Sequence, residues 1–378
     1  IRTSPDRVEA PILYRQVPPV FSFAQSNPQL MKWRLGDVSS YDPPAVVMEK
    51  QPVCGSCHTA SADGRVLGMD MDFRKDKGAY VLTTIRQEIK LTEHDFISWN
   101  TFPKIDHRQS TGLYSRVSPS GKYVVSTVNE ISLLIKMDDP NCSQLFYPLR
   151  GILALYSLDD RQIRSLPGAD DRHYVQTAPE WSPDETYVLF SRVRQNKALI
   201  KSLGKRTIFS SDGADIHALN ARYPVQFDIY RLAFNSGKGG VAEPLAGASH
   251  NGKSNYYPRY SPDGKWIVFT QSRTGLAIQP DARLFIMPAE GGKPRRMVCN
   301  RGPATSWHSW SPNGRWIVFV SKAYTPFTEL FIAHVEEDGI DSPPVRLSRF
   351  NDKLLAANVP EFINIRPDAL RNIRLSKK

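Results

Sequence analysis

Four segments of the chain are copies of one short pattern, and this repetition constrains the fold more than any other feature of the sequence. In each copy an aromatic or aliphatic residue precedes Ser-Pro, a polar turn and a run of bulky β-forming residues. Such a pattern predicts one strand, a tight turn and a second, antiparallel strand. The copies are "VSPSGKYVV" (117–125), "WSPDETYVLF" (181–190), "YSPDGKWIVF" (260–269) and "WSPNGRWIVF" (310–319).

Two weaker copies extend the series. The segment "TASADGRVLG" (59–68) keeps the turn but has alanine in place of proline, and "NVPEFIN" (358–364) matches residues 177–184 up to the turn and then stops. We therefore expect six innermost strands, of which the sixth lacks its outer partners. Residues 29–37 and 45–50 are the candidates for these partners, because they alternate like strands and belong to no repeat copy.

Further strand candidates follow each copy, so that each unit is a four-stranded antiparallel sheet of roughly 40 to 50 residues, the size of a propeller blade. This pattern resembles the TolB-like β-propeller repeats, which are related to WD-type repeats, from about residue 50 onward. The resemblance implies an all-β, six-bladed β-propeller and no particular function. We expect residues 51–378 to form the propeller and residues 1–50 to supply strands to a composite last blade. Seven blades are the alternative, because residues 182–261 have room for one more.

Residues 51–68, "QPVCGSCHTASADGRVLG", contain two cysteines and a histidine in the order C-x-x-C-H, which is the attachment signature of c-type haem. In such a site the thiols of Cys54 and Cys57 bind the porphyrin covalently and His58 ligates the iron. A zinc site would need a second Cys/His pair at matching spacing, and the sequence has none. A thioredoxin-like motif would open a helix, whereas this one precedes a β-turn. We expect one covalent haem c, with its iron, in the first blade.

The second iron ligand has several candidates. Counting outward from the turn at Asp63–Gly64 pairs Met69 with His58 across a hairpin, and a porphyrin cannot pass between such close neighbours. His308 stands three residues before the serine of its repeat copy, as His58 does in the first copy. We expect His308 to be the second metal ligand beside His58, with His250 as the next candidate and an open iron position as the remaining alternative.

Long insertions are expected on the face of the propeller that carries the haem. They comprise residues 129–150, 192–226 and 271–282, and we expect them to form a cap that limits solvent access and tunes the haem potential. Cys142 lies in the first insertion and Cys299 ends an outer strand that points the same way. A disulfide between them and two separate thiols are both open alternatives.

The chain is basic, with a formal net charge of +11 and a pI of about 9.4. Such a charge suits docking to an acidic redox partner or peripheral contact with an anionic membrane surface. No signature of a nucleic-acid-binding domain accompanies it. The longest apolar runs are far shorter than the roughly 20 residues of a membrane-spanning helix. Because the sequence starts at Ile1 rather than Met, we expect a cleaved export signal and a periplasmic or otherwise extracytoplasmic location.

Together these features predict an exported monohaem c-type cytochrome on a propeller scaffold, which transfers electrons to a redox partner. One alternative is a haem-dependent oxidoreductase that acts on a small molecule at an open iron position. The other is a TolB-like envelope interaction module in which the haem is mainly structural. No nucleophile elbow or Ser-His-Asp order supports a hydrolase.

Overall fold

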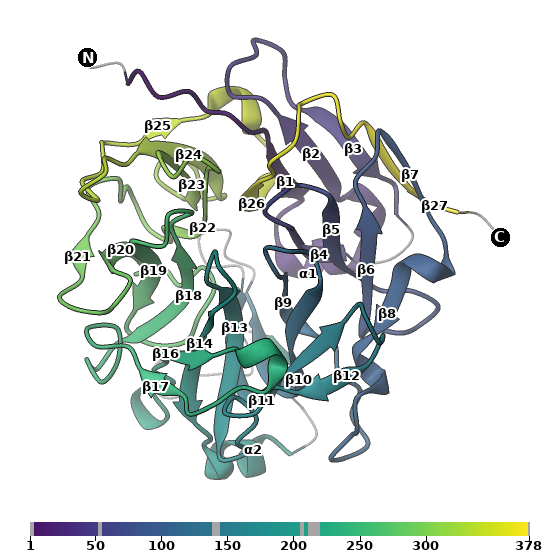
Figure 1. Ribbon diagram of the computed structural model, residues 1–378, viewed down its shortest axis with the longest axis vertical. Coiled ribbons are helices and arrows are strands. Elements are labelled where there is room, and N and C mark those ends of the chain that lie inside the picture. Colours follow the sequence, from purple (N-terminus) through teal and green to yellow (C-terminus); the bar gives the residue numbers. More distant parts are fainter. Residues whose placement is uncertain (1–3, 52–54, 138–143, 205–207, 211–219, 377–378) are drawn as a thin grey trace.

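The protein is a β-propeller, seen here in a computed structural model that describes residues 4–51, 55–137, 144–204, 208–210 and 220–376. Its sheets stand around a central axis, with β4, β9, β13, β18, β22 and β26 nearest to that axis (Figure 1). Among the described residues, four sheets have four strands each, one sheet has nine, and one pair of strands stands apart.

The four-stranded sheets run from an inner strand to an outer one. The first is β4 (Gly55–Ala60), β5 (Val66–Met71), β6 (Ala79–Thr84) and β8 (Phe96–Ser98). Two more are β18 (Ser254–Tyr260), β19 (Trp266–Ser272), β20 (Arg283–Pro288) and β21 (Arg295–Arg296), then β22 (Ser306–Trp310), β23 (Trp316–Ser321), β24 (Glu329–His334) and β25 (Val345–Arg346). The fourth is β26 (Ala356–Phe362), β1 (Ile12–Val17), β2 (Lys32–Gly36) and β3 (Ala45–Glu49).

The nine-stranded sheet contains two antiparallel ladders. One is β9 (Leu113–Val117), β10 (Tyr123–Lys136), β11 (Gln144–Ser157) and β12 (Ile163–Ser165), and the other is β13 (Tyr174–Trp181), β14 (Tyr187–Arg194), β16 (Asp228–Ala233) and β17 (Glu243–Pro244). A single parallel pair, Gly151 with Val175, joins them. The ninth strand, β15 (Ile208–Ser210), pairs in parallel with the C-terminal end of β10.

Helices are short and lie in the connections between strands. They are α1 (Phe21–Ser26) and α2 (Lys197–Leu203), with single 3-10 turns η1 (Pro28–Leu30), η2 (Glu93–Asp95), η3 (Trp99–Thr101), η6 (Asn235–Gly237) and η7 (Ser348–Phe350). Within the described part of the chain, no helix has the length and apolarity that a membrane crossing requires.

The serine of the repeat fixes the turn between the first and second strand of a sheet. Ser261 Oγ donates to Asp263 Oδ1 over 2.5 Å and accepts the N–H of Trp266 over 3.0 Å. The same two kinds of bond surround the equivalent serines Ser61, Ser182 and Ser311. A hydroxyl that bonds both sides of the loop holds the two strands in one register. The predicted strand–turn–strand units are therefore confirmed at these copies.

The aromatic residue before that serine connects neighbouring sheets. Trp181 Nε1 donates to the carbonyl of Arg116 on β9 over 3.2 Å, and Trp310 Nε1 donates to the carbonyl of Arg259 on β18 over 3.4 Å. Both indole rings otherwise pack in the apolar clusters between sheets. The core is thus divided into layers that fill the spaces between adjacent sheets.

Strands from both ends of the described chain share one sheet. β1 pairs antiparallel with β26, and the hydroxyl of Tyr14 donates to the carbonyl of Phe350 over 2.8 Å. The predicted strands at 29–37 and 45–50 are present as β2 and β3. The sequence analysis missed β1, which lies between them and β26, because "ILYRQV" is a short run without a turn signal of its own. A second link joins β27 (Asn372–Leu375) in parallel to β7 (Glu88–Leu91).

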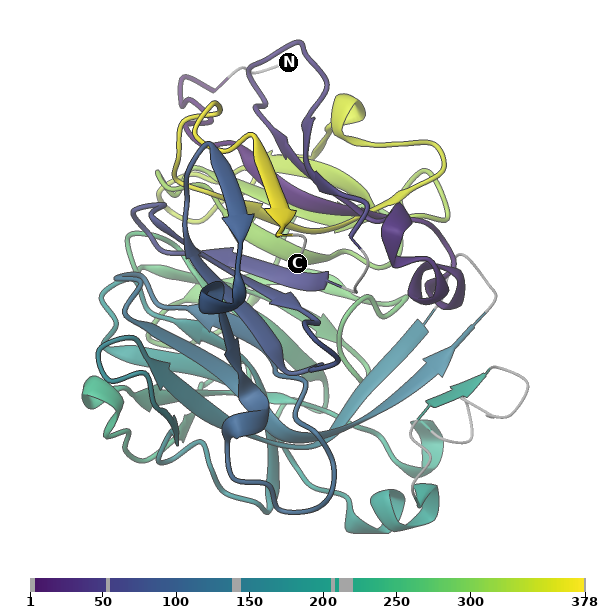
Figure 2. The same cartoon turned by 90° about the vertical axis from the view of Figure 1, so that its right-hand side faces the viewer.

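The three predicted insertions pack against one another. β10 and β11 extend as a hairpin past the neighbouring strands, as the side view shows (Figure 2). One apolar cluster joins Leu133 and Tyr147 of this hairpin to Leu199, Val225 and Leu276 of the other two insertions. We call this apolar cluster the cap. Tyr114 and Tyr257, which lie on the inner strands β9 and β18, pack against it. The cap therefore lies over one end of the central axis.

Candidate functional site

A cavity of about 50 Å³ lies on the axis between the inner strands. Its lining comes from equivalent positions of the repeat, namely the residues four, three and two places before the repeat's serine position. The lining residues are Cys57, His58, Tyr114, Ser115, Arg116, Ala178, Pro179, Glu180, Tyr257, Pro258, Arg259, Trp307, His308, Val359, Pro360 and Glu361. The repeat therefore presents three layers of side chains to the axis, and each layer has its own chemistry.

A bulge in the inner strands produces this presentation. Registers shift between Thr177 and Glu180 in β13, and at the equivalent places in β18 and β22. The first lining residue of five copies has a positive φ, from 41° at Trp307 to 58° at Tyr114. None of these five residues is glycine, so each costs on the order of 1 kcal/mol of backbone strain. A bulge turns consecutive side chains towards the same side, which places three neighbours around the axis.

The layer nearest the repeat turns is a closed quartet of charges. Arg116 binds Glu180 over 3.1 Å and Glu361 over 2.8 Å, while Arg259 binds the same two carboxylates over 2.7 and 2.5 Å. All four side chains are at least four-fifths buried. Burial lowers the pKa of Arg116, but Glu180 and Glu361 outweigh it and leave that pKa raised. Burial raises the pKa of Glu180 to about 7, although Arg116 opposes the rise. With both carboxylates ionised, the two positive and two negative charges balance, and the quartet closes the channel at this level.

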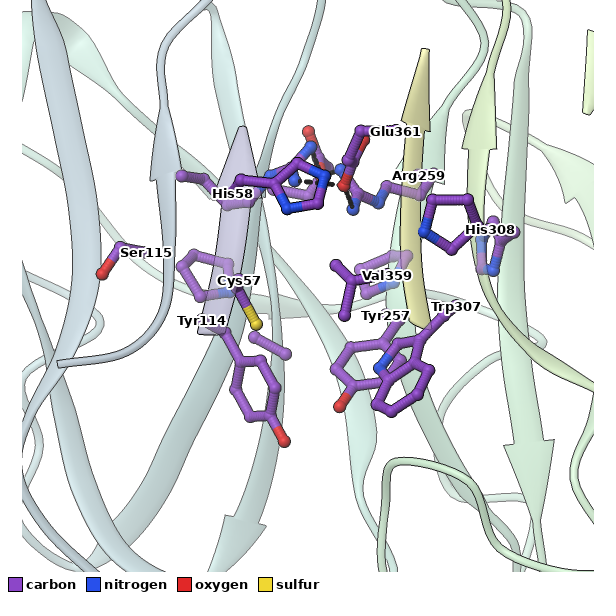
Figure 3. A pocket seen from close by; sticks show the side chains of 16 residues that line it. Cys57, His58, Tyr114, Ser115, Tyr257, Arg259, Trp307, His308, Val359 and Glu361 are labelled. Atoms are coloured by element: carbon purple, nitrogen blue, oxygen red, sulfur yellow. Dashed lines mark hydrogen bonds and ion pairs between the residues drawn. The ribbon is translucent and has the colours of Figure 1, made fainter. Parts of the chain in front are cut away.

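The opposite layer is aromatic and lies under the cap. The rings of Tyr114 and Tyr257 meet edge to face with centroids 5.2 Å apart, and Tyr114 also meets Phe146 of the cap hairpin at 6.2 Å. Burial raises the pKa of both tyrosines. Figure 3 shows these rings with Trp307 on one level, Glu361 and Arg259 on another, and the sulfur of Cys57 pointing towards the tyrosine level.

His58 and His308 form part of the middle layer, and the structure holds them in the same way. Nε2 of His58 lies 3.0 Å from the carbonyl oxygen of Leu13, and Nε2 of His308 lies 3.0 Å from that of Val268. Each acceptor belongs to the second strand of the preceding sheet. Burial lowers the pKa of both histidines to about 4, so both rings are neutral and donate from Nε2. Each Nδ1 is buried and has no hydrogen-bond partner within the described structure.

The other predicted site residues lie in different places. Met69 faces His58 across the hairpin of β4 and β5, as predicted, and packs in the apolar core. His250 is exposed, with Nδ1 3.2 Å from Asp228 Oδ2, and it does not line the axial cavity. Cys54 and Cys142 lie outside the described residues, so neither the second thioether anchor nor the Cys142–Cys299 pair can be placed. Cys299 itself is buried.

The fit of a haem to these residues is partial. Cys57 lines the cavity beside His58. The Nδ1 atoms of His58 and His308 form no hydrogen bond with the described residues, so the lone pair of each is available to ligate iron. A backbone carbonyl on the other ring nitrogen is also the usual support of a metal-bound imidazole. The cavity, however, is far smaller than the about 300–1,000 Å³ of pockets that hold small molecules. A porphyrin between the two histidines requires the inner strands to move apart.

Sequence analysis missed the charged quartet. Its signal was present, because Arg116, Glu180 and Arg259 each stand two residues before the repeat serine and Glu361 takes that place in the last copy. Superposing the copies would have shown alternating charges at a position that faces the axis. The described residues contain no group of three or more His, Cys, Asp or Glu side chains placed to hold a metal ion.

Comparison with known proteins supports the fold. TolB from Acinetobacter baumannii superimposes with a TM-score of 0.54 and 15% identity, over 95% of this chain and 68% of that chain. A chain of a nidogen/laminin complex superimposes with a TM-score of 0.52 and 7% identity, over 94% of this chain and 98% of that chain. No family model and no curated protein sequence matches the chain.

At these identities the likeness defines the fold and leaves the function open. The chain therefore has a β-propeller fold similar to that of TolB, with a capped axial channel.

Proposed function

We propose that the chain is an extracytoplasmic β-propeller that carries one covalent haem c on Cys54 and Cys57 and transfers electrons. The observation that supports this proposal is the position of Cys57, which lines the axial cavity next to His58 and beneath the cap. A haem held there supplies one-electron redox chemistry. The basic surface, with a net charge of +11, suits an acidic redox partner.

The chain's own residues have separate roles in this proposal. His58 ligates the iron through its unpartnered ring nitrogen, while the carbonyl of Leu13 orients the imidazole. His308 is the proposed second ligand, because its ring is held in the same way and lines the same cavity. The cap excludes water from the aromatic end of the channel, and the charged quartet closes the other side of the histidine layer.

The architecture carries a second part of the proposal. We count six blades, with the nine-stranded sheet taken as two, residues 1–50 as strands added to the last blade, and residues 51–378 as the propeller. This count gives each inner strand one copy of the repeat.

A different observation favours the alternative of an envelope interaction module. His58 and His308 each bind the backbone of the neighbouring sheet, so both already have a structural role that needs no iron. A protein of that kind would keep its fold and its partner without haem. A haem-dependent oxidoreductase is the third function, and it requires an iron position that stays open to a small molecule.

One experiment separates electron transfer from a haem-dependent enzyme. The protein is produced behind an added export signal in a host that attaches haem c, and is then denatured and weighed. If the protein transfers electrons, the denatured chain should keep an extra mass of about 600 Da, which is one haem bound through the C-x-x-C-H cysteines. The reduced protein should not bind carbon monoxide. Rapid carbon monoxide binding supports an enzyme. Loss of all haem on denaturation contradicts both.

The ligand assignment has its own test. His308→Ala should convert a low-spin haem to a high-spin one that binds carbon monoxide, and His250→Ala is the matched control because His250 is exposed and outside the cavity. An unchanged spectrum in His308→Ala, with the covalent haem retained, contradicts ligation by His308 without contradicting the haem itself.

A further inference from the structure

A second and larger cavity lies away from the axis. Its volume is about 410 Å³, and it is formed where β11, the start of β13, the end of β14 and helix α2 meet. The volume falls within the about 300–1,000 Å³ typical of small-molecule pockets. A single water occupies about 30 Å³ of liquid, so a bare inorganic ion would leave most of this cavity empty. The cavity is therefore sized for an organic molecule.

The cavity is strongly positive. Arg150, Arg172, Lys197 and Lys201 contribute to its lining, and none of the described residues that line it is acidic. Arg172, Lys197 and Lys201 are exposed, and none of these three forms an ion pair with a carboxylate in the described part of the chain. Cations that converge without a carboxylate repel one another, and a bound anion would relieve that repulsion.

Arg150 is the fixed element of the cavity. Its Nε donates to the carbonyl of Asn129 over 2.7 Å, and its Nη1 donates to Asp106 Oδ2 over 2.8 Å. Its Nη2 is buried and has no hydrogen-bond partner among the residues that the structure describes. Asp106 also binds Arg108 over 2.7 Å, and the hydrogen bond from Arg150 holds the pKa of Asp106 well below its usual range. One carboxylate thus serves two guanidinium groups, and these bonds hold the Arg150 side chain in one orientation beside the cavity.

Apolar groups complete the lining. Three isoleucines, Ile105, Ile152 and Ile200, share the cavity with the ring of Tyr174. Arg192 stacks on the Tyr174 ring with its guanidinium carbon 3.6 Å from the ring centroid, which fixes the ring. A ligand that matches both kinds of surface has an anionic end and an apolar body.

We propose that this cavity binds a small organic anion with at least two negative charges, carried by phosphate or carboxylate groups, and with an apolar part. The anionic end lies against Arg150, Arg172 and Lys201, and the apolar part lies against the isoleucines and Tyr174. This site is separate from the axial channel and independent of the haem proposal.

The test is calorimetric titration of the whole protein at low ionic strength with phenyl phosphate and, separately, with inorganic phosphate. Phenyl phosphate carries about two negative charges near pH 8. We expect phenyl phosphate to bind about tenfold more tightly than inorganic phosphate, because only the first buries apolar area. Both should bind more weakly as salt is added.

The double variant Arg172→Ala/Lys201→Ala removes two exposed cations of the cavity and should weaken phenyl phosphate binding by about tenfold or more. The variant Lys253→Ala/Lys293→Ala loses the same charge at exposed positions outside the cavity and should bind as the parent does. Absence of phenyl phosphate binding, equal weakening in both variants, or no weakening in the cavity variant would overturn the proposal. Because the four changed side chains are exposed, both variants should fold, which circular dichroism checks.

Discussion

The charged quartet on the axis allows a sharp prediction about stability. Glu361→Gln keeps the size of the side chain and removes one of the two negative charges. Glu361 accepts bonds from Arg116 and Arg259 over 2.8 and 2.5 Å, and only 8% of its side chain is exposed. The variant leaves two buried arginines with one carboxylate, Glu180. Breaking such a buried pair costs about 3–5 kcal/mol, because a charge stays buried without compensation.

The measurement is the free energy of unfolding from urea titrations of the haem-free protein, followed by tryptophan fluorescence and circular dichroism. Glu337→Gln is the matched control, because Glu337 also pairs with an arginine, Arg315, while 77% of its side chain is exposed. We expect the control to lose less than about 1 kcal/mol.

A second variant tests the cause of the loss. Arg116→Met added to Glu361→Gln leaves one arginine and one glutamate, which restores neutrality on the axis. We therefore expect the double variant to be more stable than Glu361→Gln alone, since the uncompensated charge is gone. The reasoning fails if Glu361→Gln lowers the free energy of unfolding no more than Glu337→Gln does. It also fails if the loss in the double variant equals the sum of the losses in Glu361→Gln and Arg116→Met measured singly.

Three further outcomes follow from the structure. Deleting residues 1–50 should abolish cooperative unfolding, because β26 then has an open edge; deleting residues 372–378, which removes only the peripheral β27, should cost much less. Between pH 6.5 and 4 the stability of the haem-free parent should fall by on the order of 3 kcal/mol relative to that of His308→Asn, because the unfolded chain gains a proton that the buried His308, with its pKa lowered to about 4, does not. Gly68→Ala should cost about 1–3 kcal/mol in urea unfolding, since its new methyl would lie 2.0 Å from the hydroxyl of Tyr80, whereas Gly240→Ala, with no atom nearer than 3.8 Å, should be almost neutral.

The local structure was readable from the sequence because it is encoded by neighbours in the chain. A serine, a turn residue and two alternating runs determine one hairpin, so the strands and the pairing of Met69 with His58 could be predicted. The shared position of His58 and His308 was also visible, because it follows from counting within each copy. Their presence in one cavity agrees with that count.

The rest depends on contacts between residues far apart in the chain. Arg116 and Glu361 are 245 positions apart, and no local pattern says that their side chains meet. The bond from His58 to the carbonyl of Leu13 depends on β1, which carries no turn signal. A ring nitrogen occupied by a backbone carbonyl cannot be inferred from C-x-x-C-H, because the acceptor is not a side chain. These contacts decide what the channel can bind, and only the assembled ring of sheets shows them.

The pairing of β1 with β26 has a consequence for the order of folding. During synthesis from the amino end, β1 is made long before β26. The edge of β1 that pairs with β26 therefore stays unpaired until the end of the chain has been made. Arg116, Glu180 and Arg259 can meet earlier, but the quartet stays one carboxylate short until Glu361 arrives on β26. Loop closure over hundreds of residues is slow, and an excess positive charge on the axis opposes a premature ring. The last inner strand to be made therefore closes the sheet and neutralises the centre in the same step, so that nearly the whole chain must be present before the propeller is stable.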